Sequence, residues 1–371
     1  MRVVLAGGGT AGHCNPALAI AGIIKSKNPS AEILFIGNEG SIEERLVQKA
    51  GYPFEAVRSQ GFRRKLTLDN IKTLRLYIQA KKRCRALIRE FKPDLVIGTG
   101  GYVSGPVVAA AQKMGIPTCI HEQNAYPGVT SKMLSKKADI VFISFPGSEQ
   151  YVGSVNRMVL SGNPLREEVL SSSRIDARRK LGLGEQDFYL LSFAGSLGAY
   201  EVNKAMVAFI AKNAEAKDFV QTHATGDRGW EWVPNEIQEK GVDLHRVNHI
   251  KVEPYLYDMA DHLAAADAVI SRAGAITLGE LTALCKPAVL IPSPNVTHNH
   301  QYHNARSLSD RGGAILLEEK DLSAERLYEL ILELKNDPVR RAELGRAAGS
   351  LALPEAAEII YREIFDLLKR K

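Results

Sequence analysis

The stretch 267–281 combines a strand, a glycine turn and a helix, and it limits what the chain can fold into. Residues 267–271 predict a short buried strand, residues 272–275 a tight turn of small residues, and residues 276–284 a helix. A strand that enters a helix this way directs free backbone N–H groups and a positive dipole end at one point, which attracts phosphate. Glu280, one turn into the helix, could accept hydrogen bonds from ribose hydroxyls. An ordinary strand–helix turn has the same pattern, so both interpretations stay open.

The same order of elements opens each half of the chain, which predicts two α/β domains with parallel sheets. A length of 371 residues is enough for two cores. In the front half, residues 3–6 predict a strand, 7–13 a glycine loop, and 15–26 a helix with Pro16 in its first turn. A second glycine loop, at 99–106, ends in Pro106 and precedes a helix expected at 107–114. In the back half, 189–193, 194–199 and 202–213 repeat the order of strand, glycine loop and helix.

The domain boundary is expected at the turn-rich joint 161–166, which precedes the polar stretch 171–187. We therefore predict an N-terminal domain over residues 1–163 and a C-terminal domain over 164–353. The amphipathic helix expected over 354–371 is predicted to pack back towards the N-terminal domain.

Charge, cysteine content and hydropathy limit the classes of partner and cofactor that this chain could bind. The net charge of +6 and the isoelectric point near 9.0 favour an anionic partner. The four cysteines contain no Cys-x-x-Cys pair, and no histidine spacing completes a zinc site. No cofactor is evident, and whether a divalent ion assists stays open. No apolar run reaches the roughly 18–20 residues of a membrane span, so we expect any membrane contact to be peripheral.

Positive charge is concentrated in residues 63–92, which carry a net charge of +9. Within this segment, Ile71, Leu74 and Ile78 recur at helical spacing. A basic helix with an apolar stripe suits an anionic membrane surface, and a contact through residues 63–85, which the family resemblance described below favours, is one interpretation. The alternative is a stripe that faces the core. A nucleic-acid partner is not favoured, since only Tyr77 offers a ring for base stacking.

His13 directly follows the first glycine loop, at the expected carboxyl end of a strand, where a histidine is well placed for proton transfer. The alternative is a histidine that caps the following helix. Gly7, Gly9 and Gly12 also satisfy the Gly-x-Gly-x-x-Gly pattern of dinucleotide-binding loops, for which Glu39 would be a distant acidic partner.

Polar residues also follow a later strand of each half. Glu122 and Asn124 follow the strand at 117–120, at the sheet edge where α/β proteins bind ligands. In the back half, three histidines lie at positions 298–303, and we favour hydrogen bonding to a sugar there over a metal site. Gln301 would serve the same purpose.

Taken in order, these motifs resemble the MurG family, the UDP-N-acetylglucosamine transferases that add the second sugar to the undecaprenyl-linked peptidoglycan precursor. The resemblance covers nearly the whole chain. It is carried by residues 8–13 with 16–18, 98–106, 121–124, 162–166, 195–199, 271–275 with Thr277 and Glu280, and Gln301 with Asn304-Ala305.

The resemblance implies a GT-B fold with two Rossmann-like domains that face across a cleft. It implies transfer of N-acetylglucosamine from UDP-GlcNAc to the 4-hydroxyl of the muramoyl sugar of lipid I, with inversion and with His13 as general base. It also implies a peripheral location at the cytoplasmic face of the plasma membrane. The expected substrate-binding residues are Thr10, Ala11, Gly12 and Asn124 in the front domain, and Arg166, Ser196, Leu256, Ala275, Ile276, Thr277, Leu278, Gly279, Glu280 and Gln301 in the back domain.

Within these roles, Ser196 and residues 275–277 would contact the diphosphate. Arg166 and the backbone of Leu256 would hold uracil, and Glu280 the ribose. Asn124 and Gln301 would read the sugar hydroxyls.

Three other functions are consistent with parts of the sequence. A related transferase could use diacylglycerol or another polyisoprenoid as acceptor. A nucleotide-dependent oxidoreductase could use the first glycine loop, but it leaves Glu280 without a role. A non-catalytic sugar-nucleotide binder would keep UDP affinity and need no His13.

Overall fold

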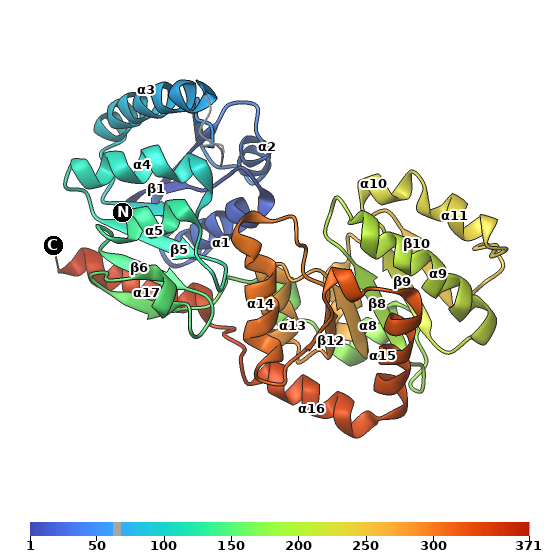
Figure 1. The fold of residues 1–371 in the computed structure, drawn as a ribbon. Helices are drawn as coiled ribbons and strands as arrows, with labels where there is room; N and C mark the ends of the chain where they lie inside the picture. The colour runs from blue at the N-terminus through green and yellow to red at the C-terminus, as the bar shows by residue number, and fades with distance from the viewer. Residues whose placement is uncertain (62–67, 371) are drawn as a thin grey trace. The chain divides into compact units, whose positions relative to one another are not determined.

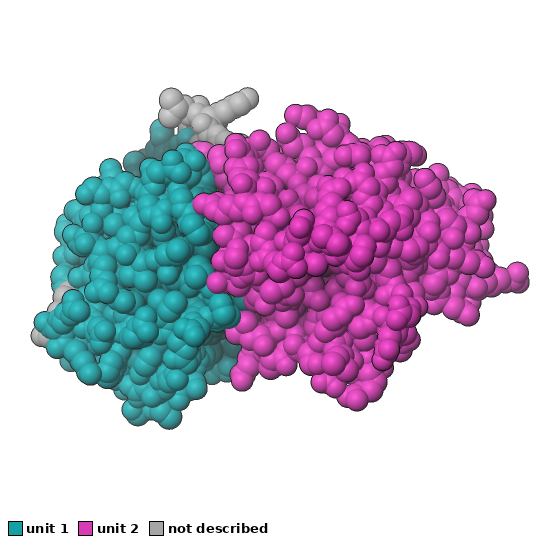
Figure 2. Space-filling view, turned by 90° about the horizontal axis from the view of Figure 1, so that it is seen from below, with its two compact units in different colours: residues 1–165, 353–371 teal, residues 166–352 magenta. Residues whose placement is uncertain are grey.

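The structure, a computed structural model, describes residues 1–61 and 68–370. Arg63, Arg64 and Lys65 of the basic segment therefore lie outside the described residues. The chain divides into two compact units: unit 1 is residues 1–165 with 353–371, and unit 2 is residues 166–352 (Figure 2). Each unit contains one parallel sheet with helices on its faces (Figure 1), which confirms the predicted α/β fold.

The described residues of unit 1 form a seven-stranded sheet in the order β3-β2-β1-β4-β5-β6-β7, and every pair is parallel. Its strands are β1 (Arg2–Ala6), β2 (Glu32–Asn38), β3 (Phe54–Val57), β4 (Leu95–Gly98), β5 (Thr118–Glu122), β6 (Ile140–Ile143) and β7 (Met158–Leu160). Its helices are α1 (Ala11–Lys27), α2 (Ile42–Lys49), α3 (Leu68–Phe91), α4 (Gly101–Lys113), α5 (Val129–Ser135), α6 (Glu149–Val152) and α17 (Ala356–Lys369).

Alternate residues of β1 point to opposite faces of this sheet, as the two-residue period of a strand requires. Val3 and Leu5 pack into one core cluster with α1 and α17, whereas Val4 and Ala6 pack into another with α3 and α4. Both faces of the strand are therefore covered, which explains its unbroken apolar sequence.

The described residues of unit 2 form a six-stranded parallel sheet in the order β10-β9-β8-β11-β12-β13. Its strands are β8 (Tyr189–Phe193), β9 (Val220–Ala224), β10 (Ile250–Glu253), β11 (Ala268–Ser271), β12 (Ala288–Leu290) and β13 (Ile315–Leu316). Its helices are α7 (Glu167–Leu170), α8 (Arg174–Lys180), α9 (Tyr200–Ala216), α10 (Asp227–Trp230), α11 (Val233–Glu239), α12 (Met259–Ala265), α13 (Ala275–Ala283), α14 (His300–Ser309), α15 (Ala324–Asn336) and α16 (Pro338–Gly349), with 3-10 turns η1 (Thr297–Asn299) and η2 (Glu319–Asp321).

Two predicted helix starts are wrong in the same way. The helix expected from Asn15 begins at Ala11, and the one expected from residue 107 begins at Gly101. Pro16 and Pro106 are therefore the sixth residues of α1 and α4. A proline at this position loses the hydrogen bond to the carbonyl four residues back, and its ring crowds that carbonyl, yet both glycine loops become helical before the proline. The residues expected in loops thus lie in the first helical turns.

The apolar stripe of α3 does not face the core at its N-terminal end. Ile71, Leu74 and Ile78 are at least half exposed. The later residues Cys84 and Ile88 are buried in the core. The core-facing alternative for the first stripe is therefore wrong.

Candidate active site

The candidate site of unit 1 lies where the strand order of its sheet reverses. From β1 the chain adds β2 and β3 on one side, and from β4 it adds β5, β6 and β7 on the other. Open parallel sheets bind ligands at the carboxyl ends of the strands at such a switch point. The loop at residues 7–10 follows β1, and the loop at residues 99–100 follows β4.

The two loops approach each other closely. A Cβ on Gly101 would lie 2.0 Å from the carbonyl oxygen of Gly8, and Gly101 has a φ of +77°. The backbone N–H of Gly8 also points at the carbonyl of Gly100, at 3.4 Å. Only glycine combines this dihedral with this approach, so these glycines set the shape of the site.

His13 lies in the first turn of α1, half-buried, at the mouth of the loop. Its Nδ1 lies 3.1 Å from the Thr10 hydroxyl, and its backbone carbonyl accepts a hydrogen bond from the Thr99 hydroxyl at 2.7 Å. The contact to Thr99 ties the start of α1 to the end of β4. Thr10 and Gly12 are exposed beside it, and Ala11 is partly exposed.

Glu43 is a site residue that the sequence reasoning missed. Its carboxylate is buried and accepts hydrogen bonds from the backbone N–H groups of Gly9 and Asn38. Glu39, the acidic residue considered for this loop, instead pairs with Arg58 on the surface. One sequence feature could have indicated this residue: Glu43 lies in the first turn of α2, where the helix dipole favours a carboxylate.

The segment after β5 is organised by the carboxylate of Glu122, which is buried. One carboxylate oxygen accepts from the backbone and side-chain amides of Asn124, and the other accepts from the backbone N–H of Gly128. Glu122 therefore shapes the turn that presents Asn124, which is partly exposed.

Unit 2 repeats the arrangement at its own switch point, between β8 and β11. The loop after β8 presents Ser196 in an exposed position. A Cβ on Gly198 would lie 2.0 Å from the Thr225 carbonyl, and Gly198 has a φ of +75°. The two units therefore build their first glycine loops by the same kind of close backbone approach.

The helix after β11 begins at Ala275, with Gly274 as its N-cap residue and no side chain capping it. The N–H groups of residues 275–277 lie in the first turn, where an α-helix has no internal acceptors for them. The Leu278 N–H already donates to Gly274, and the Leu278 side chain is fully buried. Gly279 is one residue further into the helix, beyond this first turn.

Arg166 and Glu280 meet in unit 2 although 114 residues separate them. The Arg166 Nη2 and Nε donate to one Glu280 oxygen at 2.8 Å and 3.2 Å. Burial raises the pKa of the Glu280 carboxyl, and the Arg166 guanidinium opposes that shift. The predicted uracil and ribose residues thus form one ion pair. Leu256 follows β10 with its side chain buried, so its backbone is what it can offer a ligand.

Gln301, in the first turn of α14, accepts a hydrogen bond from the Ser293 backbone N–H at 2.9 Å. Its side-chain amide NH₂ is consequently the end left to donate. Asn304, one turn on, donates to the Ala273 carbonyl and so ties α14 to the turn before α13.

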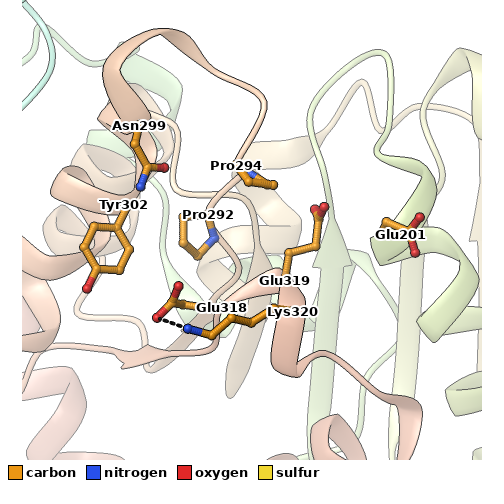
Figure 3. A pocket seen from close by; sticks show the side chains of 8 residues that line it. All are labelled: Glu201, Pro292, Pro294, Asn299, Tyr302, Glu318, Glu319 and Lys320. Atoms are coloured by element: carbon orange, nitrogen blue, oxygen red, sulfur yellow. Dashed lines mark hydrogen bonds and ion pairs between the residues drawn. The ribbon is translucent and has the colours of Figure 1, made fainter.

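A pocket of about 370 Å³ is lined in part by Tyr302, which follows Gln301 in the chain, and its lining includes three carboxylates (Figure 3). Lys320 donates to one of them, Glu318, at 3.3 Å, and Arg272 pairs with a second, Glu319. Three carboxylates against these two cations leave a negative balance, which disfavours phosphate. The lining residues are Glu201, Pro292, Pro294, Asn299, Tyr302, Glu318, Glu319 and Lys320.

Within residues 1–61 and 68–370, no group of three or more His, Cys, Asp or Glu side chains is arranged to hold a metal ion, and this includes the histidines at 298–303. In the same part of the chain, no helix has the length and apolar character needed to cross a bilayer.

Two Rossmann-like units of this topology, each with glycine loops at its switch point, define the GT-B class of glycosyltransferases. Residues 3–143 match the glycosyltransferase family 28 N-terminal domain, and residues 189–360 match the glycosyltransferase family 28 C-terminal domain. The chain belongs to this family, within the group whose members are named UDP-N-acetylglucosamine–N-acetylmuramyl-(pentapeptide) pyrophosphoryl-undecaprenol N-acetylglucosamine transferase.

Relatives match over the full length. The transferase of that name from Acetivibrio thermocellus is 44% identical over 100% of this chain and 99% of its own, and one from Bacillus cereus is 43% identical over 100% of both. The crystal structure of Acinetobacter baumannii MurG aligns with a TM-score of 0.78 and 27% identity, covering 100% of this chain and 99% of that one. An S. aureus MnaA–UDP structure aligns with a TM-score of 0.69 and 14% identity, covering 100% of this chain and 97% of that one, which is a similarity in fold alone.

Proposed function

We propose that this protein transfers N-acetylglucosamine from UDP-N-acetylglucosamine to the muramoyl sugar of undecaprenyl-pyrophosphoryl-linked muramoyl-pentapeptide, the lipid I that peptidoglycan synthesis uses. The observation that carries the proposal is the full-length similarity, 44% identical over the whole chain, to transferases named for this reaction. The two glycine-loop sites, one per unit, suit a reaction with a nucleotide donor and a separate acceptor.

The donor binds to unit 2 in this proposal. The diphosphate lies at the first turn of α13, where the N–H groups of Ala275, Ile276 and Thr277 and the helix dipole supply positive charge. Ser196 adds a hydroxyl from the loop after β8. The acidic pocket lined by Glu201, Glu318 and Glu319 is the wrong environment for two phosphates, which supports the α13 position.

The nucleoside end is read by Glu280, Arg166 and the backbone of Leu256. Glu280 has one carboxylate oxygen paired with Arg166, so its second oxygen remains to accept from a ribose hydroxyl. The guanidinium keeps charge on a buried carboxylate, and an ionised carboxylate accepts stronger hydrogen bonds than a neutral one.

Gln301 donates hydrogen bonds from its side-chain NH₂ to the sugar hydroxyls, because its carbonyl oxygen already accepts one from the Ser293 backbone N–H. We assign Asn124, Thr10, Ala11 and Gly12 the remaining contacts to the donor sugar.

His13 acts as general base. It takes the proton from the muramoyl 4-hydroxyl as that oxygen attacks the anomeric carbon of N-acetylglucosamine, and the bond from this carbon to UDP breaks. Attack from the face opposite UDP inverts the configuration. Leaving-group charge is stabilised by the α13 N–H groups, a preorganised electrostatic contribution.

The acceptor binds to unit 1. A pocket of about 660 Å³ adjoins the glycine loop there, and Tyr102, which lines it, lies against Gly9. Its lining contains the ion pair of Arg58 with Glu39 and the hydrogen-bonded Ser59 and Asn38, beside the apolar Leu76. Such a mixed lining suits a substrate that has both sugar hydroxyls and a peptide. We propose that this pocket receives the muramoyl-peptide end of the acceptor.

Unit 1 also supplies the membrane contact in this proposal. Ile71, Leu74 and Ile78 form an exposed apolar strip on α3, and exposed Lys72, Arg75, Lys82 and Arg83 flank it. Each basic side chain near an anionic surface contributes about 1 kcal/mol. The protein would then act as a peripheral protein at the cytoplasmic face of the plasma membrane, where its lipid acceptor would be presented.

The test is transfer of radiolabel from UDP-N-acetylglucosamine to a short-chain lipid I analogue, with diacylglycerol beside it. We expect labelled lipid II-like product only with the lipid I analogue. Label on diacylglycerol alone would move the protein to lipid glycosylation. His13→Ala should lower kcat by about 10²–10⁴-fold while UDP binding persists, and an unchanged kcat would remove His13 from the mechanism.

The membrane contact is tested by sedimentation with anionic vesicles. The triple variant Ile71→Ser, Leu74→Ser, Ile78→Ser should lose most of its binding. Ile175→Ser is the control, since Ile175 is even more exposed, at 78%, but lies on α8 of unit 2. Equal binding by both variants would refute the contact.

A further inference from the structure

Gln123 has a buried side chain with one satisfied end and one unsatisfied end. It is 2% exposed. Its Nε2 lies 2.9 Å from His121 Nδ1 and donates to the His121 carbonyl at 3.1 Å. Its Oε1 has no hydrogen-bond partner among the described residues. A buried acceptor left without a donor costs about 1–3 kcal/mol, so a donor for this oxygen is to be expected.

The orientation of the Gln123 amide follows from His121. His121 Nε2 lies 3.0 Å from the Gly162 carbonyl, an acceptor only, so this nitrogen carries the proton. Burial lowers the pKa of His121, which keeps its ring neutral and its Nδ1 an acceptor. Only the NH₂ end of Gln123 can face Nδ1, and Oε1 is consequently directed the other way.

That direction leads to His13. A Cβ placed on Gly100 would lie 3.4 Å from Gln123 Oε1 and 3.3 Å from His13 Nε2. Both atoms therefore border the same small space, which exists because residue 100 has no side chain. On its opposite edge, the His13 ring places Nδ1 beside the Thr10 hydroxyl.

We propose that Gln123 is a positioning residue for the catalytic base: the two atoms approach each other across the space left at Gly100, where Oε1 accepts the Nε2–H of His13 and so leaves Nδ1 as the basic nitrogen. This inference rests on the proposed function. The acceptor hydroxyl displaces the Thr10 hydroxyl from Nδ1 and gives that nitrogen its proton as the new glycosidic bond forms and UDP leaves. The resulting imidazolium keeps its Nε2–H on Gln123, which stabilises the charge. A third group that orients a catalytic histidine is a recurring arrangement.

The test combines kinetics and histidine ¹⁵N NMR on the full-length protein. Gln123→Met should lower kcat by about 10- to 100-fold, with KM for UDP-N-acetylglucosamine within about twofold because the contacts proposed for the nucleotide lie on the other unit and Gln123 has none of the sugar contacts. Gln221→Met is the matched control. Gln221 is also a buried glutamine with one unpartnered atom, but it lies on β9 of unit 2, and its replacement should leave kcat unchanged.

NMR gives a readout that loss of packing alone would not change. The wild-type His13 ring, assigned by comparison with His13→Gln, should be the Nε2–H tautomer, and Gln123→Met should reduce that population. An Nδ1–H tautomer in the wild type, or a Gln123→Met variant with unchanged kcat and tautomer, would overturn the proposal. In a further outcome, the wild type transfers nothing to lipid I while Gln123→Met still reduces the Nε2–H tautomer of His13. That result would support Gln123 as the residue that positions His13, and it would overturn the proposed function.

Discussion

At the scale of single residues, the Arg166–Glu280 pair joins a half-exposed guanidinium to a buried carboxylate. Burial raises the pKa of Glu280, and Arg166 opposes this. Removing the guanidinium in Arg166→Met should raise that pKa further, so more of the carboxylate is protonated as the pH falls. We expect KM for UDP-N-acetylglucosamine to rise between pH 8 and 5.5 more steeply in Arg166→Met than in the wild type. The double variant with Glu280→Gln should lose this extra slope, and parallel profiles would contradict the idea.

His223 predicts a pH dependence of stability at the same scale. Burial lowers its pKa from an ordinary 6.5 to about 4. As the pH falls below about 6.5, the unfolded chain binds this proton before the folded chain does, so stability is lost between pH 6.5 and 4. The loss amounts to about 3 kcal/mol at most. Urea unfolding followed by tryptophan fluorescence should show a shallower decline in His223→Gln, since both tryptophans, Trp230 and Trp232, lie in the same unit as His223.

At the scale of elements, α4 offers a comparison of two glycines. Gly101 at its start and Gly115 after its end both have positive φ, +77° and +73°. A Cβ at Gly115 meets nothing within 4 Å, whereas one at Gly101 meets the Gly8 carbonyl at 2.0 Å. Gly115→Ala should therefore cost only the dihedral penalty, about 1–2 kcal/mol. Gly101→Ala should lower the free energy of unfolding, followed by circular dichroism, by clearly more than this. It should also lower kcat. Equal costs would mean that the close approach does not matter.

In unit 1, α1 and α4 begin earlier than the sequence predicts, so the predicted glycine loops before them are too long. Proline is most common at the first helical position, so Pro16 and Pro106 suggested that helices begin beside them. The backbone of residues 11–13 and 101–105 is nevertheless helical. The loop-to-loop contact between Gly8 and Gly101, and the bond from Thr99 to the His13 carbonyl, hold these turns in place. Such contacts are not visible in a local sequence pattern.

At the scale of the whole molecule, the chain leaves unit 1 after Leu165 and returns to it at Leu353. Its last helix, α17, buries Ile360 and Ile364 in the core beside α1, where each contributes about 2–3 kcal/mol. Ile360→Ala should destabilise unit 1 by about 2–4 kcal/mol, seen by circular dichroism, while tryptophan fluorescence, which reports unit 2, changes little. Phe365→Ala, at an exposed position of the same helix, is the control. An equal fall in the midpoint of the unfolding transition followed by tryptophan fluorescence would show that the two units unfold together.

Much of this protein follows from its sequence. Apolar runs bounded by glycine turns indicate parallel α/β sheets because both faces of such strands are covered. The ordered motifs indicated the GT-B fold and the transferase family. Tertiary structure alone decided the pairing of Arg166 with Glu280, the burial of Glu43 under Gly9, and the hydrogen bond of the Gln123 amide to the buried His121 ring. These groups meet only when the chain folds, and burial then determines which charges and hydrogen bonds they keep.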